Sequence, residues 1–237
     1  MKYYIACLHV NPNNPPKNQP RGLWISKENL TKIAARAPGA PFTYNHRGVH
    51  EAVAIIGKNH ITPAAMHRTL AKIAERDPSK AAIGSVTEAF IGHDGALWCI
   101  LIVDDTLYVS ITAIIDAGIT TGVSLTHIEP NGPKKQINDD WTAVEVALTN
   151  DPARKGANIT FASHDLQAVT LYANAIKEGR INSSPTMADE PTDDIASILN
   201  SLAPASKLIL EVTPKFISNQ TKPNIDPSHF IDPSHSS

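Results

Sequence analysis

Short apolar runs separated by turn-forming segments dominate roughly the first 180 residues of the chain. Runs of this length, rich in branched and aromatic side chains, are typical of buried β-strands. They predict strands at residues 2–10, 52–56, 81–90, 96–103, 120–127 and 141–148. The sequence Gly92-His93-Asp94-Gly95 joins two of these runs, which indicates an antiparallel hairpin.

Four other segments carry apolar residues at helical spacing, each after a good start signal. Ser26 can cap a helix that runs to about Arg36, and Thr62-Pro63 can begin a second one. Residues 104–106 precede a third helix that stops at Gly118, and Ser163 can cap a fourth at residues 165–178. The last helix has a stripe that suits either the core or the seam of a dimer, formed by Leu166, Val169, Ala173 and Ile176. This order of elements predicts an α+β fold with a β-barrel-like core sheet surrounded by helices.

The composition changes after about Arg180, where the chain reads SSPTMADEPTDD. Acidic, proline-containing and weakly apolar segments are typical of linkers. We therefore expect one folded domain at residues 1–180. Residues 181–237 would be a flexible linker and tail, which also suits the start of a scaffold-like segment.

Composition excludes several classes of function. The hydrophobic content of 42% supports a sizeable core, and the net charge of -2 argues against a nucleic-acid binder. No apolar run is long enough to cross a bilayer, so we expect a soluble intracellular protein without a membrane partner. The cysteines Cys7 and Cys99 lie in apolar runs, which suits reduced core thiols better than a disulfide.

The candidate chemistry begins with Ser124, which lies in the apolar run Thr120–His127. A serine hydroxyl is a weak nucleophile unless an imidazole takes its proton and a third group orients that imidazole. His46 and Glu145 are candidates for these two roles. Each also has a simpler interpretation: Ser124 as a small packed residue, His46 as a loop histidine, and Glu145 as a solvent-facing strand residue.

The order of five segments resembles the herpesvirus capsid maturation protease, assemblin. These segments are TYNH, IGSVTEAFIGHDGALWCILIVDD, an apolar helix, GVSLTH and VEVALTNDPARKG. The resemblance covers about residues 1–180 and implies that His46 is the general base and Ser124 the nucleophile. Thr126 stands where the family has a second hydroxyl residue.

Two positions depart from the herpesvirus pattern. The family's third catalytic residue is a histidine, whereas this chain has Glu145. An acid at this place is similar to the related prohead proteases of tailed phages, and a carboxylate orients an imidazole well. In place of consecutive arginines, the loop after the strand reads Ala153-Arg154-Lys155-Gly156. The resemblance implies that the Ala153 N–H and Arg154 receive the oxyanion.

The resemblance implies a serine endopeptidase, without metal or cofactor, that cleaves viral capsid scaffold protein and also itself. It further implies a homodimer, for which the helix at residues 165–178 would provide a reasonable seam. The enzyme would act in the assembling capsid, in a host nucleus or a bacterial cytoplasm. The bonds Ala162-Ser163, Ala196-Ser197 and Ala205-Ser206 match the family's preference for cleavage after alanine.

Other interpretations stay open from the sequence. The chain could be a catalytically inactive capsid-assembly or scaffold module with a protease-like fold. A weaker alternative is a zinc hydrolase that uses His46 and His50, although no H-E-x-x-H pattern is present. His127 and His164 are reserve partners for Ser124, and Asp139-Asp140 is a reserve acid.

Overall fold

A computed structural model of the chain describes residues 1–9, 25–128, 141–154 and 156–181. Apart from Ile181, the predicted linker and tail therefore lie outside the described residues. The described strands are β1 (Lys2–His9), β2 (Pro41–Tyr44), β3 (Gly84–Ile91), β4 (Leu97–Val103), β5 (Val123–Ile128), β6 (Thr142–Leu148) and β7 (Asn158–Ser163). The helices are α1 (Lys27–Arg36), α2 (Val49–Ile56), α3 (Pro63–Ala74), α4 (Val109–Asp116) and α5 (Leu166–Lys177), with short 3-10 turns at Lys58–His60 and Pro78–Lys80.

The seven strands form one mixed sheet in the order β5-β6-β2-β3-β4-β1-β7. All neighbours pair antiparallel except β2 and β6, which are parallel. The sheet curls until its two edges meet. Gly122 bridges Asn158, and the N–H of Val123 donates to the carbonyl of Ala157 at 3.1 Å. The barrel-like α+β fold is confirmed.

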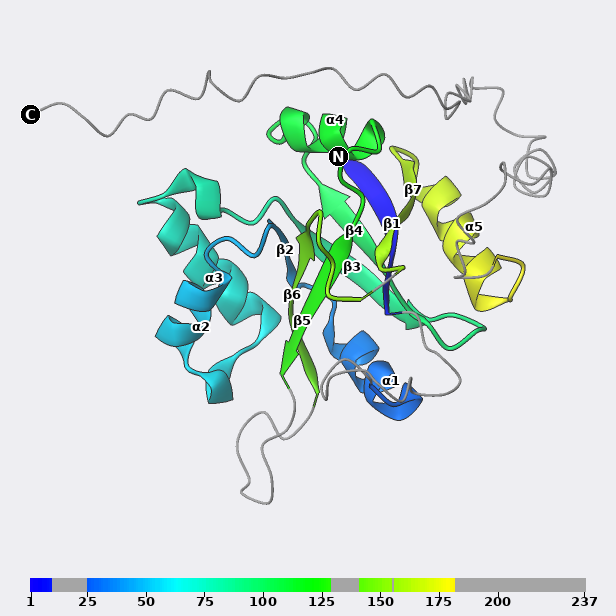
Figure 1. Cartoon of the computed structure of the whole chain (residues 1–237), viewed down its shortest axis with the longest axis horizontal. Coiled ribbons are helices and arrows are strands. Elements are labelled where there is room, and N and C mark those ends of the chain that lie inside the picture. The colour runs from blue at the N-terminus through cyan, green and yellow to red at the C-terminus, as the bar shows by residue number, and fades with distance from the viewer. Residues whose placement is uncertain (10–24, 129–140, 155, 182–237) are drawn as a thin grey trace, which may run out of the picture. The chain divides into compact units, whose positions relative to one another are not determined.

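The interior of this barrel is the main core, and all seven strands contribute to it. Its buried members include Tyr4, Phe42, Val86, Leu101, Leu125, Val146 and Ile159. α1 adds Leu30 and Ile33, and α4 adds Ile115. Figure 1 shows these two helices at opposite ends of the sheet, so each covers one mouth of the barrel.

The outer face of the sheet is covered on two sides. α5 packs on β1 and β7 over a second cluster that includes Trp98, and α2 with α3 pack over a third cluster that includes Val144 (Figure 1). The α5 stripe is mainly core, because Val169, Ala173 and Ile176 are each 1% exposed or less. A dimer seam along this stripe is therefore wrong, and Leu166 alone of the four is exposed.

The helices at Ser26, at Thr62 and before Gly118 are confirmed, and so is the hairpin of β3 and β4. The predicted strand at residues 52–56 is wrong, because this segment belongs to helix α2. Its apolar residues Val49, Ala52, Val53 and Ile56 follow helical spacing once the run is extended back to Gly48. The cap of α5 is Asp165 and not Ser163, and strand β7 was not predicted.

The two cysteines lie on adjacent strands but on opposite faces of the sheet. Cys99 belongs to the barrel interior, and Cys7 belongs to the outer cluster beneath α5. Both are free and buried, and burial raises the pKa of the Cys7 thiol to about 12. These thiols are therefore protonated core residues.

Gly84 offers a test of how tightly β3 and β4 pack. A Cβ at this position would lie 2.0 Å from the carbonyl oxygen of Ile102, which is backbone of the paired strand. We expect Gly84→Ala to lower the free energy of unfolding by at least about 2 kcal/mol, because the strands must separate. Urea unfolding followed by circular dichroism measures this loss. Ser85→Ala, one residue along, should cost less than about 1 kcal/mol, and equal losses would contradict the packing described.

Candidate active site

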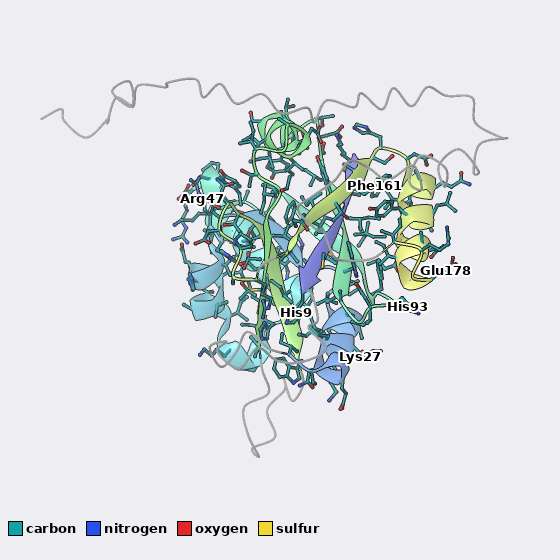
Figure 2. The ribbon with its side chains drawn as sticks, turned by 45° about the vertical axis from the view of Figure 1, so that its right-hand side comes forward. His9, Lys27, Arg47, His93, Phe161 and Glu178 are labelled. Atoms are coloured by element: carbon teal, nitrogen blue, oxygen red, sulfur yellow. The ribbon has the colours of Figure 1, made fainter. Side chains whose placement is uncertain are left out.

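A left-handed turn between β2 and α2 presents His46. Asn45 has φ 51° and His46 has φ 57°, a backbone region that non-glycine residues seldom adopt. The N–H of Asn45 donates to the carbonyl of Leu148 at 2.9 Å, which ties the turn to the end of β6. Arg47, the next residue, lies on the side of the molecule that carries α2 and α3 (Figure 2). Backbone strain of this kind is concentrated at functional sites in proteins.

A β-bulge in β6 sets the direction of Glu145. Thr126 pairs with Glu145, and the next pair is His127 with Ala143, so Val144 is an extra residue without a partner on β5. In a regular strand Val144 and Val146 would share a face. Here Val144 packs beneath α2 and α3, whereas Val146 lies inside the barrel. The bulge therefore allows Val144 and Glu145 to lie on the same outer face.

Glu145 is fully buried and accepts three side-chain hydrogen bonds. The hydroxyl of Thr43 donates to Oε2, and Nδ1 of His46 lies against Oε1. The hydroxyl of Thr126 also donates to Oε1, at 3.0 Å. Burial of a carboxylate is costly unless donors replace its water shell. These three groups replace that shell: Thr43 and His46 come from β2 and the turn directly after it, and Thr126 comes from β5.

The contact with Glu145 determines the chemistry of His46. Since a carboxylate is an acceptor, Nδ1 carries the hydrogen and Nε2 is the basic nitrogen of the neutral ring. The hydrogen bond with Glu145 raises the pKa of His46, against the opposing effect of partial burial. The side chain is 34% exposed, so the ring remains accessible. A histidine held in this way is suited to accept a proton near neutral pH.

Ser124 lies on β5, two residues before Thr126, and therefore on the same face of the strand. It pairs with Ala147, whereas Thr126 pairs with Glu145. Diagonal neighbours in an antiparallel pair are separated by roughly 7–8 Å, so Ser124 lies close to the acid. Among the described residues, however, the Ser124 hydroxyl makes no hydrogen bond to His46 or to another group. The acid and base are in contact, and the role of Ser124 stays a prediction.

The segment that contains Ala153 and Arg154 returns to the start of β5. Hydrogen bonds hold its beginning and end at that position. The N–H of Thr149 donates to the carbonyl of Gly122 at 2.9 Å, and the N–H of Val123 donates to the carbonyl of Ala157. Ala153 is exposed and Arg154 is partly buried. The Ala153 N–H donates to no acceptor among the described residues. These features suit an oxyanion loop, although the roles of both residues stay predictions and Lys155 is outside the described residues.

The reserve partners are engaged elsewhere or lie outside the described residues. His127 stacks on Trp141 with ring centroids 5.4 Å apart. Burial, with a smaller effect of the nearby Arg154 charge, lowers its pKa to about 4. His164 contacts Asp105 at 2.8 Å. Asp139 and Asp140 are outside the described residues.

Among the described residues, the zinc hydrolase alternative lacks a cluster of metal-binding side chains. His50 is exposed on α2, whereas His46 lies in the preceding turn with Nδ1 against Glu145. The described residues contain no group of three or more histidine, cysteine or acidic side chains that could hold a metal ion. Nor does any described helix have the length and apolar character needed to cross a membrane.

Thr43 is a residue of the site that the sequence did not identify. It is fully buried in β2 and lies three residues before His46. A single threonine inside an apolar strand that leads directly to the candidate base was a weak signal. This threonine gave no indication that β2 pairs in parallel with β6. That pairing brings Thr43 opposite Ala147.

Comparison with known proteins gives structural similarities alone. No family model matches the sequence, and no curated protein matches it. The chain is similar to the Kaposi's sarcoma-associated herpesvirus (KSHV) protease in complex with a hexapeptide phosphonate inhibitor, with 15% identity and a TM-score of 0.45. That match covers 92% of this chain and 83% of the other.

Two further structures of the same herpesvirus protease, with allosteric inhibitors, match at 15% identity and a TM-score of 0.39. They cover 91% and 92% of this chain, and 98% of the other chain in both cases. At these values the similarities assign no function to the chain. The contacts of His46 and Glu145 described above are independent of them.

Replacement of the acid tests the electrostatics of the site. We expect Glu145→Gln to lower the pKa of His46 to or below its ordinary value near 6.5, because the main cause of the upward shift is removed while burial remains. A titration of the His46 ring protons by NMR measures this change. Glu51→Gln is the control, since Glu51 on α2 pairs with Arg76 and Lys80 instead. An unchanged His46 pKa in Glu145→Gln would contradict the assignment.

The same pair links stability to pH. The pKa of His46 is raised in the folded state, so protonated His46 contributes stability that is fully present below the unfolded pKa of about 6.5. This contribution is lost as the pH rises through the folded-state value. The difference in unfolding free energy between wild type and Glu145→Gln should accordingly be larger at pH 6 than at pH 9.

Proposed function

We propose that the chain is a serine endopeptidase with Ser124 as nucleophile, His46 as base and Glu145 as the acid that orients the base. The contact between the buried Glu145 carboxylate and His46 Nδ1 carries this proposal. It leaves Nε2 as the proton acceptor, and the nearby face of β5 holds Ser124. A buried acid, a histidine and a hydroxyl in this relation are the elements of acyl transfer.

In the proposed reaction, the Ser124 oxygen attacks the carbonyl carbon of the scissile bond while Nε2 of His46 accepts its proton. Glu145 stabilises the resulting imidazolium, and the Ala153 N–H and Arg154 receive the negative oxygen of the tetrahedral intermediate. Collapse of the intermediate breaks the C–N bond, and His46 returns the proton to the leaving amine. Water then attacks the acyl-enzyme with His46 again as base, which releases the acid and restores Ser124.

The substrate that we propose is viral capsid scaffold protein, on the basis of the resemblance of the sequence segments to assemblin. The proposal includes action in the assembling capsid, in a host nucleus if the virus is herpesvirus-like or a bacterial cytoplasm if it is phage-like. It also includes a homodimer. Since most of the α5 stripe is core, the seam of that dimer would use other residues.

A second candidate function is a catalytically inactive capsid-assembly module. The specific observation in its favour is that, within the described residues, the Ser124 hydroxyl makes no hydrogen bond to His46. Unliganded proteases often have long or poorly aligned catalytic hydrogen bonds, which tighten when substrate binds. For this reason we favour the enzyme.

A fluorophosphonate label separates the two candidates. We expect labelling of Ser124 in the wild-type chain, none in Ser124→Ala, and rates lower by roughly 10²–10⁴ in His46→Ala and Glu145→Gln. Mass spectrometry of the labelled peptides identifies the modified residue. Ser110→Ala, an exposed position on α4, should label like wild type. Absence of labelling in wild type would favour the inactive module. Labelling of Thr126 would identify Thr126, and not Ser124, as the nucleophile.

Self-processing has a more restricted range of sites than the sequence suggested. The Ala162-Ser163 bond lies within β7, where both residues pair with β1, so a protease cannot reach it in the folded domain. Ala196-Ser197 and Ala205-Ser206 lie outside the described residues. We expect mass spectrometry of freshly expressed wild type to show a C-terminus trimmed at one of these two bonds, and intact chain for Ser124→Ala. Wild type that stays intact at high concentration in kosmotropic salt would argue against self-processing.

A further inference from the structure

Both ends of loop 149–157, the candidate oxyanion loop, are held by the short segment that leads into β5. At the start of the loop, the N–H of Thr149 donates to the carbonyl of Gly122 at 2.9 Å. Just after its end, the N–H of Ile159 donates to the carbonyl of Thr121 at 2.8 Å. Carbonyls of successive residues in an extended chain point to opposite sides. The loop therefore begins on one side of this segment and ends on the other, so it must cross it.

The crossing takes place at Gly122. A Cβ at this position would lie 2.5 Å from the carbonyl oxygen of Thr149 and 3.1 Å from Cδ of Pro152, so a side chain would collide with the loop. Gly122 bridges Asn158 antiparallel, which continues the extended line of β5. Since alternate residues of a strand share a face, the Cβ direction of Gly122 is also that of Ser124. Pro152 thus lies on the face of the strand that carries the candidate nucleophile.

A side-chain hydrogen bond fixes the same loop at Asn150. The hydroxyl of Thr120 donates to Oδ1 of Asn150, with the two oxygens 2.5 Å apart. Thr120 is 3% exposed, so water competes little for its hydroxyl. Asn150 is exposed, so packing does not hold its side chain and the bond to Thr120 does.

The contacts of the loop run in register along the strand. From the hydrogen bond at Asn150 to the packing at Pro152, the loop advances by two residues, and so does the strand. The next strand residue on this face is Ser124. The loop residues that follow Pro152 are Ala153 and Arg154, the two candidates for the oxyanion site.

We propose that Thr120 is a positioning residue of the candidate active site: its hydroxyl holds Asn150 and thereby directs the Ala153 N–H towards the place where the oxyanion forms. The inference rests on the proposed protease function and adds the group that sets its oxyanion site. Thr120 touches neither the substrate nor the reacting atoms. Its loss should therefore lower the rate of reaction and leave the contact between the acid and the base unchanged.

The test compares Thr120→Val, which removes the hydroxyl at nearly constant shape, with Thr120→Ser, which keeps it. The measurement is the rate of fluorophosphonate labelling of Ser124 across the titration range of His46. In this reaction the serine oxygen displaces fluoride from phosphorus, and the phosphoryl oxygen takes the oxyanion position. We expect Thr120→Val to label more slowly than wild type by roughly 10-fold to 10²-fold at every pH, with the same midpoint of the pH profile. Thr120→Ser should label close to the wild-type rate.

Thr112→Val is the matched control. Thr112 is also buried, at 7% exposed, and its hydroxyl bonds the carbonyls of Tyr108 and Val109 within α4. It should label like wild type, so the loss in Thr120→Val would not be a general effect of a missing threonine hydroxyl. Thermal unfolding shows whether each variant is folded at the labelling temperature.

Asn150→Ala removes the same hydrogen bond from its exposed side and provides the second variant if Thr120→Val does not fold. It should slow labelling to a similar extent. The double variant should label no more slowly than either single one, because the two residues act through one bond.

Equal labelling rates for wild type and a folded Thr120→Val would overturn the inference and keep the enzyme. So would a shifted midpoint of the pH profile, which would indicate an effect through His46, or a rate in Thr120→Ser as low as in Thr120→Val. Absence of labelling in wild type would refute the proposed function, and the positioning role with it.

Discussion

Burial of the Glu145 carboxylate is the constraint on which the rest of the site depends. A carboxylate without access to water must find donors, and here Thr43, His46 and Thr126 supply them from β2, the turn that follows it, and β5. These contacts hold β2 with its following turn, and β5, around one carboxylate. The position of His46 therefore follows from the need to supply hydrogen-bond donors to the buried Glu145 carboxylate.

The parallel pairing of β2 and β6 makes this arrangement possible. Because β2 lies beside β6, the chain leaves β2 next to Leu148 at the end of β6, and the left-handed turn then directs His46 back towards Glu145. The antiparallel pairing of β5 with the other edge of β6 places Thr126 on the opposite side of the same acid. β2 with its turn, β5 and β6 are distant in sequence, and they meet because β6 lies between β5 and β2 in the sheet.

Much of this fold could be predicted from the sequence, and the failures have physical reasons. Strong local signals identified α1, α3 and the hairpin, since caps, proline and glycine act over a few residues. Residues 52–56 were misread because a short branched run has no distinct period, and the helical spacing appears only when Val49 is included. β7 was missed because it is a partly exposed edge strand with one buried residue, Ile159.

The site was predictable in composition but not in geometry. His46, Glu145 and Thr126 were named from sequence, but the sequence allowed Glu145 to face solvent between two valines. The bulge at Val144 decides its direction, and a bulge depends on pairing with β5, which no local pattern encodes. Thr43 escaped notice for the same reason, because its partner lies 102 residues away in the sequence.

The closure of the sheet between Gly122 and Asn158 affects how neighbouring copies of the protein can associate. An open sheet exposes two unpaired edges, and such edges recruit strands from neighbouring molecules. In this protein the two edge strands begin to pair with each other, so the length of exposed edge is reduced at both. If the chain works at high local concentration, as the proposed function would require, it offers less free edge for pairing with neighbouring copies.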